Sequence, residues 1–545
     1  MFDIKIINGT ILDGSGKLRF RADVGINGDK ITAVGNLANA KAAKTIDATG
    51  KFVSPGFIDF HTHSDLSLVY DPFARSRIYT GVTTDVIGNC GIGVAPVREE
   101  RKNDLIQYLG TRIIGTIPAP LELHWNTVQE YFDYLDSHKP AVNVVAYVAQ
   151  GAIRIDEMGF SDAPPTAEQM EHMKAEVRKA MEAGCVAMST GLVYLPGAYS
   201  SKEELAELAK ELAPYNGYYI SHIRSEGDDE MPALDEAIYI AKTAGVPLHV
   251  SHLKVMGKAN FGKIDQIFAK LDAAEKDGLD VRFDCYPYTA GMTSLGAFLP
   301  AWVFEGGVSN MLDRVKQPEN RERIKREMTE GVPGWQNFYL MSGGWDGVSI
   351  ASVMTEKNKH LEGRGFGDIV KETGEDPFDL FFRLLIEEES KVQVVAFTQG
   401  QEDTDKVVVH PKTCIGSDSM TFSHEGIMSQ GKPHPRAFGT MGRIFSYYVK
   451  EKQMLTFEDA VRKITHLPAT YLGIDATRGL IKEGYFADIV VFAPDEITDK
   501  ATYIDPRQYT VGIKYVLVNG EVALADGVQT DVCAGRVVKN PTVAK

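Results

Sequence analysis

The 545-residue sequence contains no apolar run of the roughly 18 residues that a membrane-spanning helix needs. Its first residues, Met1–Thr10, also lack the basic and apolar regions of a secretory signal. Cysteine is scarce: the five residues are odd in number and widely spaced, which does not fit a disulfide framework. These absences predict a cytoplasmic protein with free thiols and no membrane contact.

An excess of basic residues is also missing. The 58 Lys and Arg residues stand against 74 Asp and Glu residues, which gives a formal net charge of −16. Such a balance disfavours nucleic acid and anionic membranes as partners and leaves a small molecule as the expected ligand. No G-x-G-x-x-G follows an early strand, so the sequence does not favour a dinucleotide-binding open sheet.

Both ends of the chain consist of short alternating segments separated by turn residues. Near the N-terminus, Asn8-Gly9 and Asn27-Gly28 interrupt strand-like runs, and near the C-terminus Asn519-Gly520 does the same. Neither end shows a helical period. We therefore predict that residues 1–55 and 479–545 together form one small β-sandwich domain.

The central region, residues 56–478, alternates buried strands with amphipathic helices such as Ala167–Ala183. Eight strands are predicted, at residues 57–60, 82–87, 142–148, 185–189, 218–224, 247–254, 280–286 and 413–419. This rhythm indicates an α/β fold, a (β/α)8 TIM-like barrel. Residues from about 290 to 411 exceed any ordinary connection and are predicted to form an inserted subdomain or lid.

Reactive side chains recur where the predicted strands end. His61 and His63 form an H-x-H pair after the first strand, and period-two alternation would place Asp59 on the same face. His222, His252 and Asp418 close later strands. An isolated H-x-H also fits a turn with two exposed histidines, and the sequence around Asp418 fits an ordinary turn. Because barrel active sites lie at the carboxyl ends of strands, the recurrence favours a metal site.

Several longer motifs go beyond this pattern. They are P-G-F-I-D-F-H-T-H (55–63), G-N-C-G (88–91), S-T-G-L with Y-L-P-G (189–197), S-H-I-R-S-E (221–226), S-H-L-K (251–254), D-C-Y-P-Y (284–288) and G-S-D (416–418). With them the chain resembles the amidohydrolase superfamily, and within it the N-acyl-D-amino-acid deacylases, or D-aminoacylases. The resemblance implies zinc-dependent hydrolysis of the amide bond of N-acyl-D-amino acids, which releases a carboxylate and a free D-amino acid.

The resemblance also assigns roles to individual residues. It implies that Cys90, His222 and His252 hold a tight zinc, and that His61 and His63, sharing Cys90, hold a weaker second ion. Asp418 would carry a proton from the attacking water to the leaving amine. Tyr194, Lys254 and Tyr288 would bind the substrate α-carboxylate, with Arg224 and Arg436 as further candidates. Gly291 and Gln150 depart from the family pattern, which usually has serine and histidine there, and this leaves substrate preference open.

Two other interpretations remain. A cyclic amidase of the hydantoinase or dihydroorotase type would use the same barrel, but such relatives usually bridge two metals with a carbamylated lysine on the fourth strand. Residues 185–196 contain no lysine. A non-enzymatic scaffold would be expected to have lost metal ligands, whereas every proposed ligand is present.

Overall fold

The computed structural model describes residues 1–112 and 121–543. Within them, eight parallel strands lie side by side in chain order and form the central barrel. The barrel closes between its first and last strands, where the Phe60 N–H donates to the Ile415 carbonyl at 3.2 Å and Thr62 pairs with Ser419. The strands are β8 (Phe57–Asp59), β9 (Val82–Ile87), β10 (Asn143–Ala149), β11 (Ala187–Gly191), β12 (Tyr218–His222), β13 (Leu248–Val250), β14 (Val281–Cys285) and β18 (Thr413–Ile415).

Helices cover the outside of this barrel. Alternate residues of the strands, such as Ile58, Val145 and Ile220, fill the interior, while Phe57, Val144 and Leu248 pack outward. Burial on both faces explains why the strands read as nearly continuous apolar runs. The covering helices include α5 (Gln150–Met158), α6 (Ala167–Ala183), α7 (Lys202–Ala209), α8 (Glu230–Ala244), α9 (Ile264–Lys276), α15 (Gln401–Val409), α16 (Arg436–Arg443) and α17 (Phe457–Ile464).

Helix α6 lies where the sequence predicts it. It begins after Thr166, whose side chain accepts from the Gln169 N–H in a capping box, and it ends at Gly184, whose φ is +125°. The cap of α7 is Ser201, which accepts from the Glu204 N–H, while the hydroxyl of Ser200 donates to the Glu204 carboxylate.

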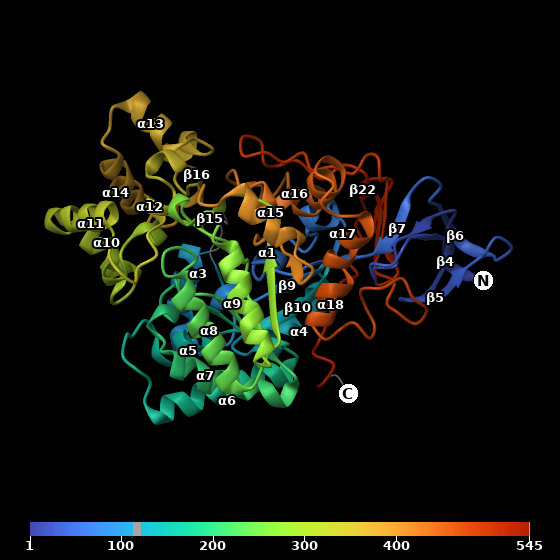
Figure 1. Ribbon diagram of the computed structural model, residues 1–545, viewed down its shortest axis with the longest axis horizontal. Coiled ribbons are helices and arrows are strands. Elements are labelled where there is room, and N and C mark those ends of the chain that lie inside the picture. Colours follow the sequence, from blue (N-terminus) through green and yellow to red (C-terminus); the bar gives the residue numbers. More distant parts are fainter. Residues whose placement is uncertain (113–120, 544–545) are drawn as a thin grey trace.

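The two ends of the chain build a sandwich of two sheets beside the barrel. A four-stranded sheet contains β1 (Phe2–Ile7), β4 (Asp23–Asn27), β5 (Lys30–Gly35) and β6 (Ala42–Asp47). The second sheet, of seven strands, is composed of β2 (Thr10–Ile11), β3 (Phe20–Arg21), β7 (Phe52–Pro55), β19 (Ile489–Phe492), β20 (Ile513–Val518), β21 (Glu521–Ala525) and β22 (Val528–Gln529). Figure 1 shows the blue N-terminal strands next to red strands of the C-terminal region there, with β7 and β22 labelled.

Strand β19 joins the sandwich to the barrel. It pairs with β7 on one edge and with β20 on the other. Ile489 and Val491 point into the sandwich core, whereas Val490 and Phe492 belong to the core around the barrel. Because both faces of β19 are covered, the sandwich and the barrel share one continuous packed region.

An inserted subdomain lies at the opposite end of the molecule from the sandwich (Figure 1). Its antiparallel sheet contains β15 (Gly291–Ser294), β17 (Gln393–Ala396) and β16 (Val348–Ser352), in that order. Its helices include α10 (Val308–Lys316), α11 (Pro318–Glu330), α12 (Phe338–Met341), α13 (Phe366–Thr373) and α14 (Pro377–Glu387). Trp345 stacks on Phe366 at 4.7 Å and anchors a separate apolar core.

The strands that carry the predicted site are shorter than the sequence suggests. β13 ends at Val250 and β18 at Ile415, before His252 and Asp418, and these two residues have φ values of +35° and +49°. The chain thus turns out of the sheet to present both side chains. Between β9 and β10 the chain forms α3 (Lys102–Arg112) and α4 (Val128–His138), and residues 113–120 lie outside the described part.

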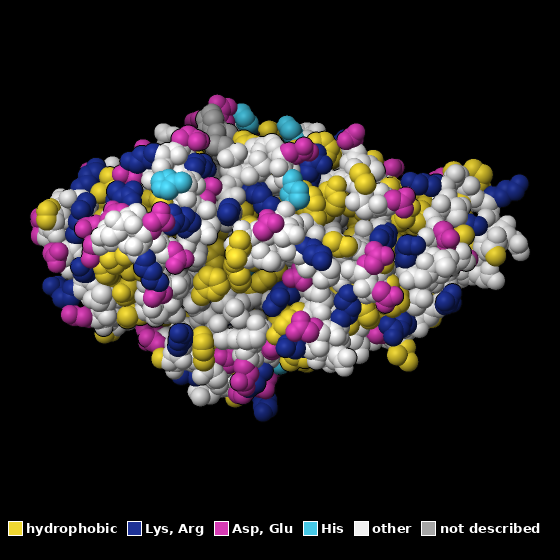
Figure 2. Space-filling view, turned by 90° about the horizontal axis from the view of Figure 1, so that it is seen from above, with side chains coloured by type: hydrophobic (Ala, Val, Ile, Leu, Met, Phe, Trp, Pro, Cys, Tyr) yellow, Lys and Arg dark blue, Asp and Glu magenta, His cyan; other side chains and the backbone are white. Residues whose placement is uncertain are grey.

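The charged surface and the free cysteines are those that the amino-acid composition predicts. Among the described residues, none of the helices combines the length and apolar character needed to cross a membrane. All five cysteines lie in the described part and are free, and four of them are buried. In Figure 2 acidic and basic side chains intermingle over the visible face, and no continuous basic stripe appears there.

Candidate active site

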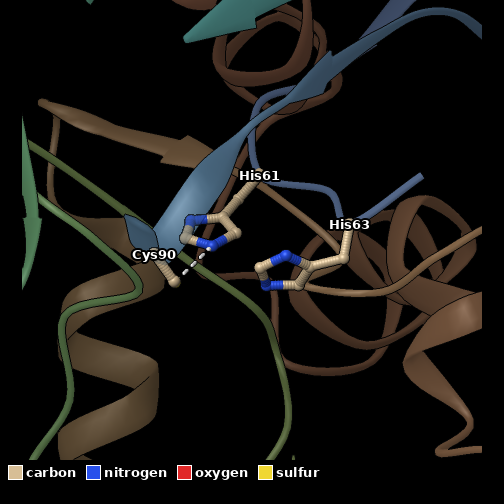
Figure 3. Close-up of side chains that lie close together, drawn as sticks. All are labelled: His61, His63 and Cys90. Atoms are coloured by element: carbon tan, nitrogen blue, oxygen red, sulfur yellow. Dashed lines mark hydrogen bonds between the residues drawn. The ribbon is translucent and has the colours of Figure 1, made fainter. Parts of the chain in front are cut away.

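Histidine and cysteine side chains converge at the carboxyl end of the barrel. The Cys90 Sγ lies 3.3 Å from Nε2 of His61 and 3.3 Å from Nε2 of His252. Figure 3 shows His61, His63 and Cys90 facing one another. Two sets of ligand atoms, each lying within 4.8 Å of one another, contain Cys90: one with His222 and His252, the other with His61 and His63. The cysteine stands between the two sets.

A tight turn after β9 presents Cys90. Gly88 has φ +78° and Cys90 itself has φ +55°, so the chain reverses within three residues. Asn89 fixes this turn by donating to the carbonyls of Val86 (2.9 Å) and Thr62 (3.2 Å). Although burial alone would raise the pKa of the Cys90 thiol, the imidazoles of His61 and His252 hold that pKa well below its ordinary value. The site therefore favours the thiolate, the form that binds metal.

Asp284 orients two of the histidines. Its Oδ1 lies 3.1 Å from Nδ1 of His61 and accepts the backbone N–H of His252 at 2.9 Å. A carboxylate on Nδ1 leaves Nε2 of His61 free to face Cys90, an arrangement common around metal-bound histidines. Its Oδ2 lies 2.9 Å from Nε2 of His249. His249 also stacks on Phe60, with 4.7 Å between the ring centroids.

Glu226 contacts His252 and Lys254. Its Oε1 lies 2.9 Å from Nδ1 of His252 and accepts from the Lys254 ammonium at 2.6 Å. Burial alone would raise the pKa of Glu226, but Lys254 and the imidazoles of His222 and His252 hold it below its ordinary value. Burial alone would lower the pKa of Lys254, but the neighbouring Glu226 carboxylate holds that pKa above its ordinary value. Both groups are therefore charged at neutral pH.

The donor set fits a zinc ion. Both ring nitrogens of His222 are buried, and neither makes a hydrogen bond of normal geometry. Its Nε2 lies 3.5 Å from Glu226 Oε2, at ion-pair distance only. A buried imidazole without a hydrogen-bond partner, close to a thiolate and a second imidazole, matches the nitrogen and sulfur ligands that Zn²⁺ prefers.

Asp418 lies between His63 and Arg436. Its Oδ1 is 3.2 Å from Nε2 of His63, and its Oδ2 accepts from Nη1 of Arg436 at 2.8 Å. Burial alone would raise the pKa of Asp418, but Arg436 and His63 hold it well below its ordinary value. Asp418 is thus a carboxylate that can accept a proton through Oδ1.

The predicted substrate-binding residues divide into two groups. Tyr194, Lys254 and Arg436 line the pocket together with Cys90 and Asp418. Arg224 and Tyr288 do not line it. Because β12 ends at His222, period-two alternation no longer applies at Arg224, and its guanidinium pairs with Glu236 of α8 at 2.9 Å.

Tyr286 takes the place expected for Tyr288. Tyr288 is buried against His434, at 5.1 Å between ring centroids, whereas Tyr286 lines the pocket beneath the Arg436 guanidinium. Tyr286 follows the end of β14 and Glu226 follows the end of β12, so alternation gave no signal for either residue.

The two departures from the family pattern lie in different surroundings. Gly291 is part of the pocket wall, and the missing side chain leaves space there. Gln150 lies outside that wall and donates to the Ser200 hydroxyl at 2.9 Å. Of these two residues, only Gly291 therefore borders the space in which a substrate would lie. Asp59 also departs from expectation: β8 ends at this residue, and its carboxylate contacts Arg77 and the Ser417 backbone.

Comparison with known proteins identifies the family of the chain. A profile of the amidohydrolase family matches residues 44–299 and 412–524. The chain is 32% identical to the D-aminoacylase of Alcaligenes xylosoxydans xylosoxydans, over 98% of this chain and 97% of that protein. It is 33% identical to the N-acyl-D-glutamate deacylase of the same organism, over 95% and 93% of the two chains.

A solved structure shows the same architecture. N-acyl-D-glutamate deacylase from Bordetella bronchiseptica, complexed with zinc and a phosphonate inhibitor that mimics the tetrahedral intermediate, superposes with a TM-score of 0.80 at 32% identity and 99% coverage of both chains. The resemblance noted in the sequence is thereby confirmed, as is the barrel with its additional sheet domain. On profile, full-length identity and fold, the chain belongs to the amidohydrolase family.

Proposed function

We propose that this chain is a zinc-dependent N-acyl-D-amino-acid deacylase, which hydrolyses the linear amide to a carboxylate and a free D-amino acid. The position of Cys90 carries the proposal: its sulfur lies 3.3 Å from ring nitrogens of both His61 and His252, at the centre of the two candidate ligand sets. The relatives named above, which match over nearly the whole chain, are deacylases. This favours a deacylase over a cyclic amidase and over a scaffold without activity.

In this proposal Cys90, His222 and His252 hold the tighter zinc, and His61 and His63 share Cys90 with a weaker second ion. A bound zinc ion supplies a water of lowered pKa and polarises the amide carbonyl. Asp284 and Glu226 fix the orientation of His61 and His252 through their second ring nitrogens.

Asp418 is the proposed proton carrier. Arg436 occupies its Oδ2, which leaves Oδ1 facing the histidines. From there it takes a proton from the attacking water and gives it to the leaving nitrogen, because an amine leaves poorly as an anion. Lys254 and Arg436 supply positive charge for the substrate α-carboxylate, and Tyr194 and Tyr286 border the same space.

A hydrolysis screen tests the function. Purified protein is incubated with paired N-acetyl-D- and N-acetyl-L-amino acids covering acidic, apolar and polar side chains, and the free amine and the zinc per chain are measured on one sample. Release of D-amino acids together with bound zinc is expected. Hydrolysis of hydantoin or dihydroorotate without any linear N-acyl substrate would instead establish a cyclic amidase.

A further inference from the structure

A buried charged cluster lies behind the metal pocket and outside the machinery described so far. It consists of Arg77 from α2 (Arg75–Ile78), Asp59 at the end of β8 and Asp85 on β9. Each of the three residues is at most 1% exposed. Asp59 and Asp85 are register neighbours on the paired strands, and the Arg77 Nε donates to both oxygens of Asp85, at 2.9 and 3.1 Å.

Two members of this cluster bind the backbone on either side of Asp418. The Ser417 N–H donates to Asp59 Oδ1 at 2.7 Å, and the Ser419 carbonyl accepts from Arg77 Nη2 at 2.6 Å. Between them, the Asp418 N–H donates to the His61 carbonyl at 2.8 Å. Three successive residues of the turn are therefore held by neighbouring elements of the barrel.

The conformation of Asp418 explains why such fixing is needed. Its φ of +49° lies in the left-handed region, which an L-residue other than glycine adopts at a cost in free energy. Such a residue keeps that conformation only when surrounding contacts determine it. Charged groups bond more strongly to backbone atoms than neutral groups do, and burial strengthens these bonds further.

We propose that Arg77 and Asp59 are positioning residues for the deacylase reaction: they hold the 417–419 turn so that the Asp418 carboxylate faces the metal pocket. Asp85 orients Arg77 for this task. The inference rests on the proposed function, since Asp418 is its proton carrier. A displacement of about 1 Å at such a group can cost on the order of 10²-fold in rate.

Three variants test the proposal. Arg77→Met removes the bond to the Ser419 carbonyl, Arg77→Lys keeps the charge but cannot bridge Asp85 and Ser419, and Asp59→Leu keeps a similar size but removes the oxygen that accepts the Ser417 N–H. Arg478→Lys is the matched control: Arg478 is buried and paired with Asp488 beside Asn519, in the sandwich region. Zinc content, kcat, KM and melting temperature are measured for each.

We expect the Arg77 variants to lose turnover while substrate binding stays nearly unchanged. In Arg77→Met, kcat should fall by at least about tenfold with zinc retained and KM changed by no more than about threefold, and Arg77→Lys should recover part of that loss. Arg478→Lys should lower the melting temperature and leave kcat unchanged. Wild-type kcat in a folded, zinc-loaded Arg77→Met protein would overturn the proposal. If that variant does not fold, Asp59→Leu decides by the same criteria.

A crystal structure of Asp59→Leu, which lacks an acceptor for the Ser417 N–H, separates this inference from the proposed function. The 417–419 turn should shift and the Asp418 carboxylate should leave its place beside His63, whatever substrate the protein uses. An unchanged turn would refute the positioning role even if the protein is a deacylase. A wild-type protein inactive on every N-acyl-D-amino acid would refute the function, while a shifted turn would still support the role of Asp59.

Discussion

Cys90 is the residue on which the metal site depends most. Its sulfur contacts one imidazole from each of the two ligand sets, so its removal affects both. A thiolate with two imidazoles is a stronger zinc site than the His61–His63 pair alone.

We expect about one tightly bound zinc per purified chain, and its loss in Cys90→Ala or His252→Ala. Metal analysis after extensive dialysis provides the measurement. His138→Ala is a suitable control, because His138 is exposed at the end of α4. Full zinc retention in both ligand variants would contradict the assignment.

Asp418→Asn should separate proton transfer from binding. Asparagine has nearly the same shape and tolerates the left-handed conformation, but it cannot take up a proton. We expect kcat to fall by ~10²–10⁴ with zinc content unchanged. If kcat stayed above about a tenth of the wild-type value, Asp418 would be only a turn residue.

At the scale of the element, the end of β18 must approach the segment after β8 closely. A Cβ added at Gly416 would lie 2.4 Å from the Cβ of His61 and 2.7 Å from its backbone nitrogen. Neither atom can move without shifting the H-x-H segment. Glycine at position 416 thus lets the barrel close where its proposed ligands lie.

Gly416→Ala should therefore lower stability by about 1–3 kcal/mol and reduce zinc binding, because the two strand ends must separate. Denaturant unfolding and metal analysis measure the two effects. Gly110→Ala provides the control, since Gly110 lies within helix α3 with open space around its Cα, and alanine there should be neutral or stabilising. Equal stability of the two variants would argue against the close approach.

How far the sequence predicts these elements depends on where each strand ends. The (β/α)8 order and helix α6 could be predicted, because apolar periodicity and caps are local signals. The places of His222 and His252 at strand ends predicted that these two residues would converge, whereas the role of Cys90 came from the resemblance to the deacylases. Arg224 and Tyr288 could not be placed, since alternation fails once the chain leaves the sheet. The residue limits assigned to the domains stay predictions.

The buried clusters were beyond a sequence-based prediction for another reason. Arg77 reaches Ser419 across 342 positions of sequence, and Glu226 meets Lys254 across 28. Such contacts depend on how the closed barrel brings distant elements together, and one sequence alone carries no record of them.

At the scale of the whole molecule, the candidate zinc ligands come from two pairs of neighbouring strands, β8 with β9 and β12 with β13, and from the turns that follow them. An ion bound there joins these two pairs, which lie on either side of β10 and β11 in the strand order. Since zinc binds the assembled site better than the unfolded chain, it should stabilise the whole barrel.

Removal of zinc by a chelator should thus lower the melting temperature, and added zinc should restore it. Saturation at 1,000 times the dissociation constant corresponds to about 4 kcal/mol. Calorimetry of loaded, stripped and reloaded protein measures this, with Cys90→Ala as the variant that should not respond to zinc. Identical melting temperatures of loaded and stripped wild-type protein would contradict a site that spans the barrel.

The pairing of β7 with β19 has a consequence for synthesis of the chain. β7 spans Phe52–Pro55 and runs directly into the first barrel strand, yet its neighbour β19 begins only at Ile489. At ~5–20 residues per second, a ribosome needs on the order of tens of seconds to make the intervening sequence. During that time one edge of β7 lacks its final partner. Completion of the sandwich is therefore a late, post-translational step, and the nascent chain is the form of this protein most exposed to aggregation.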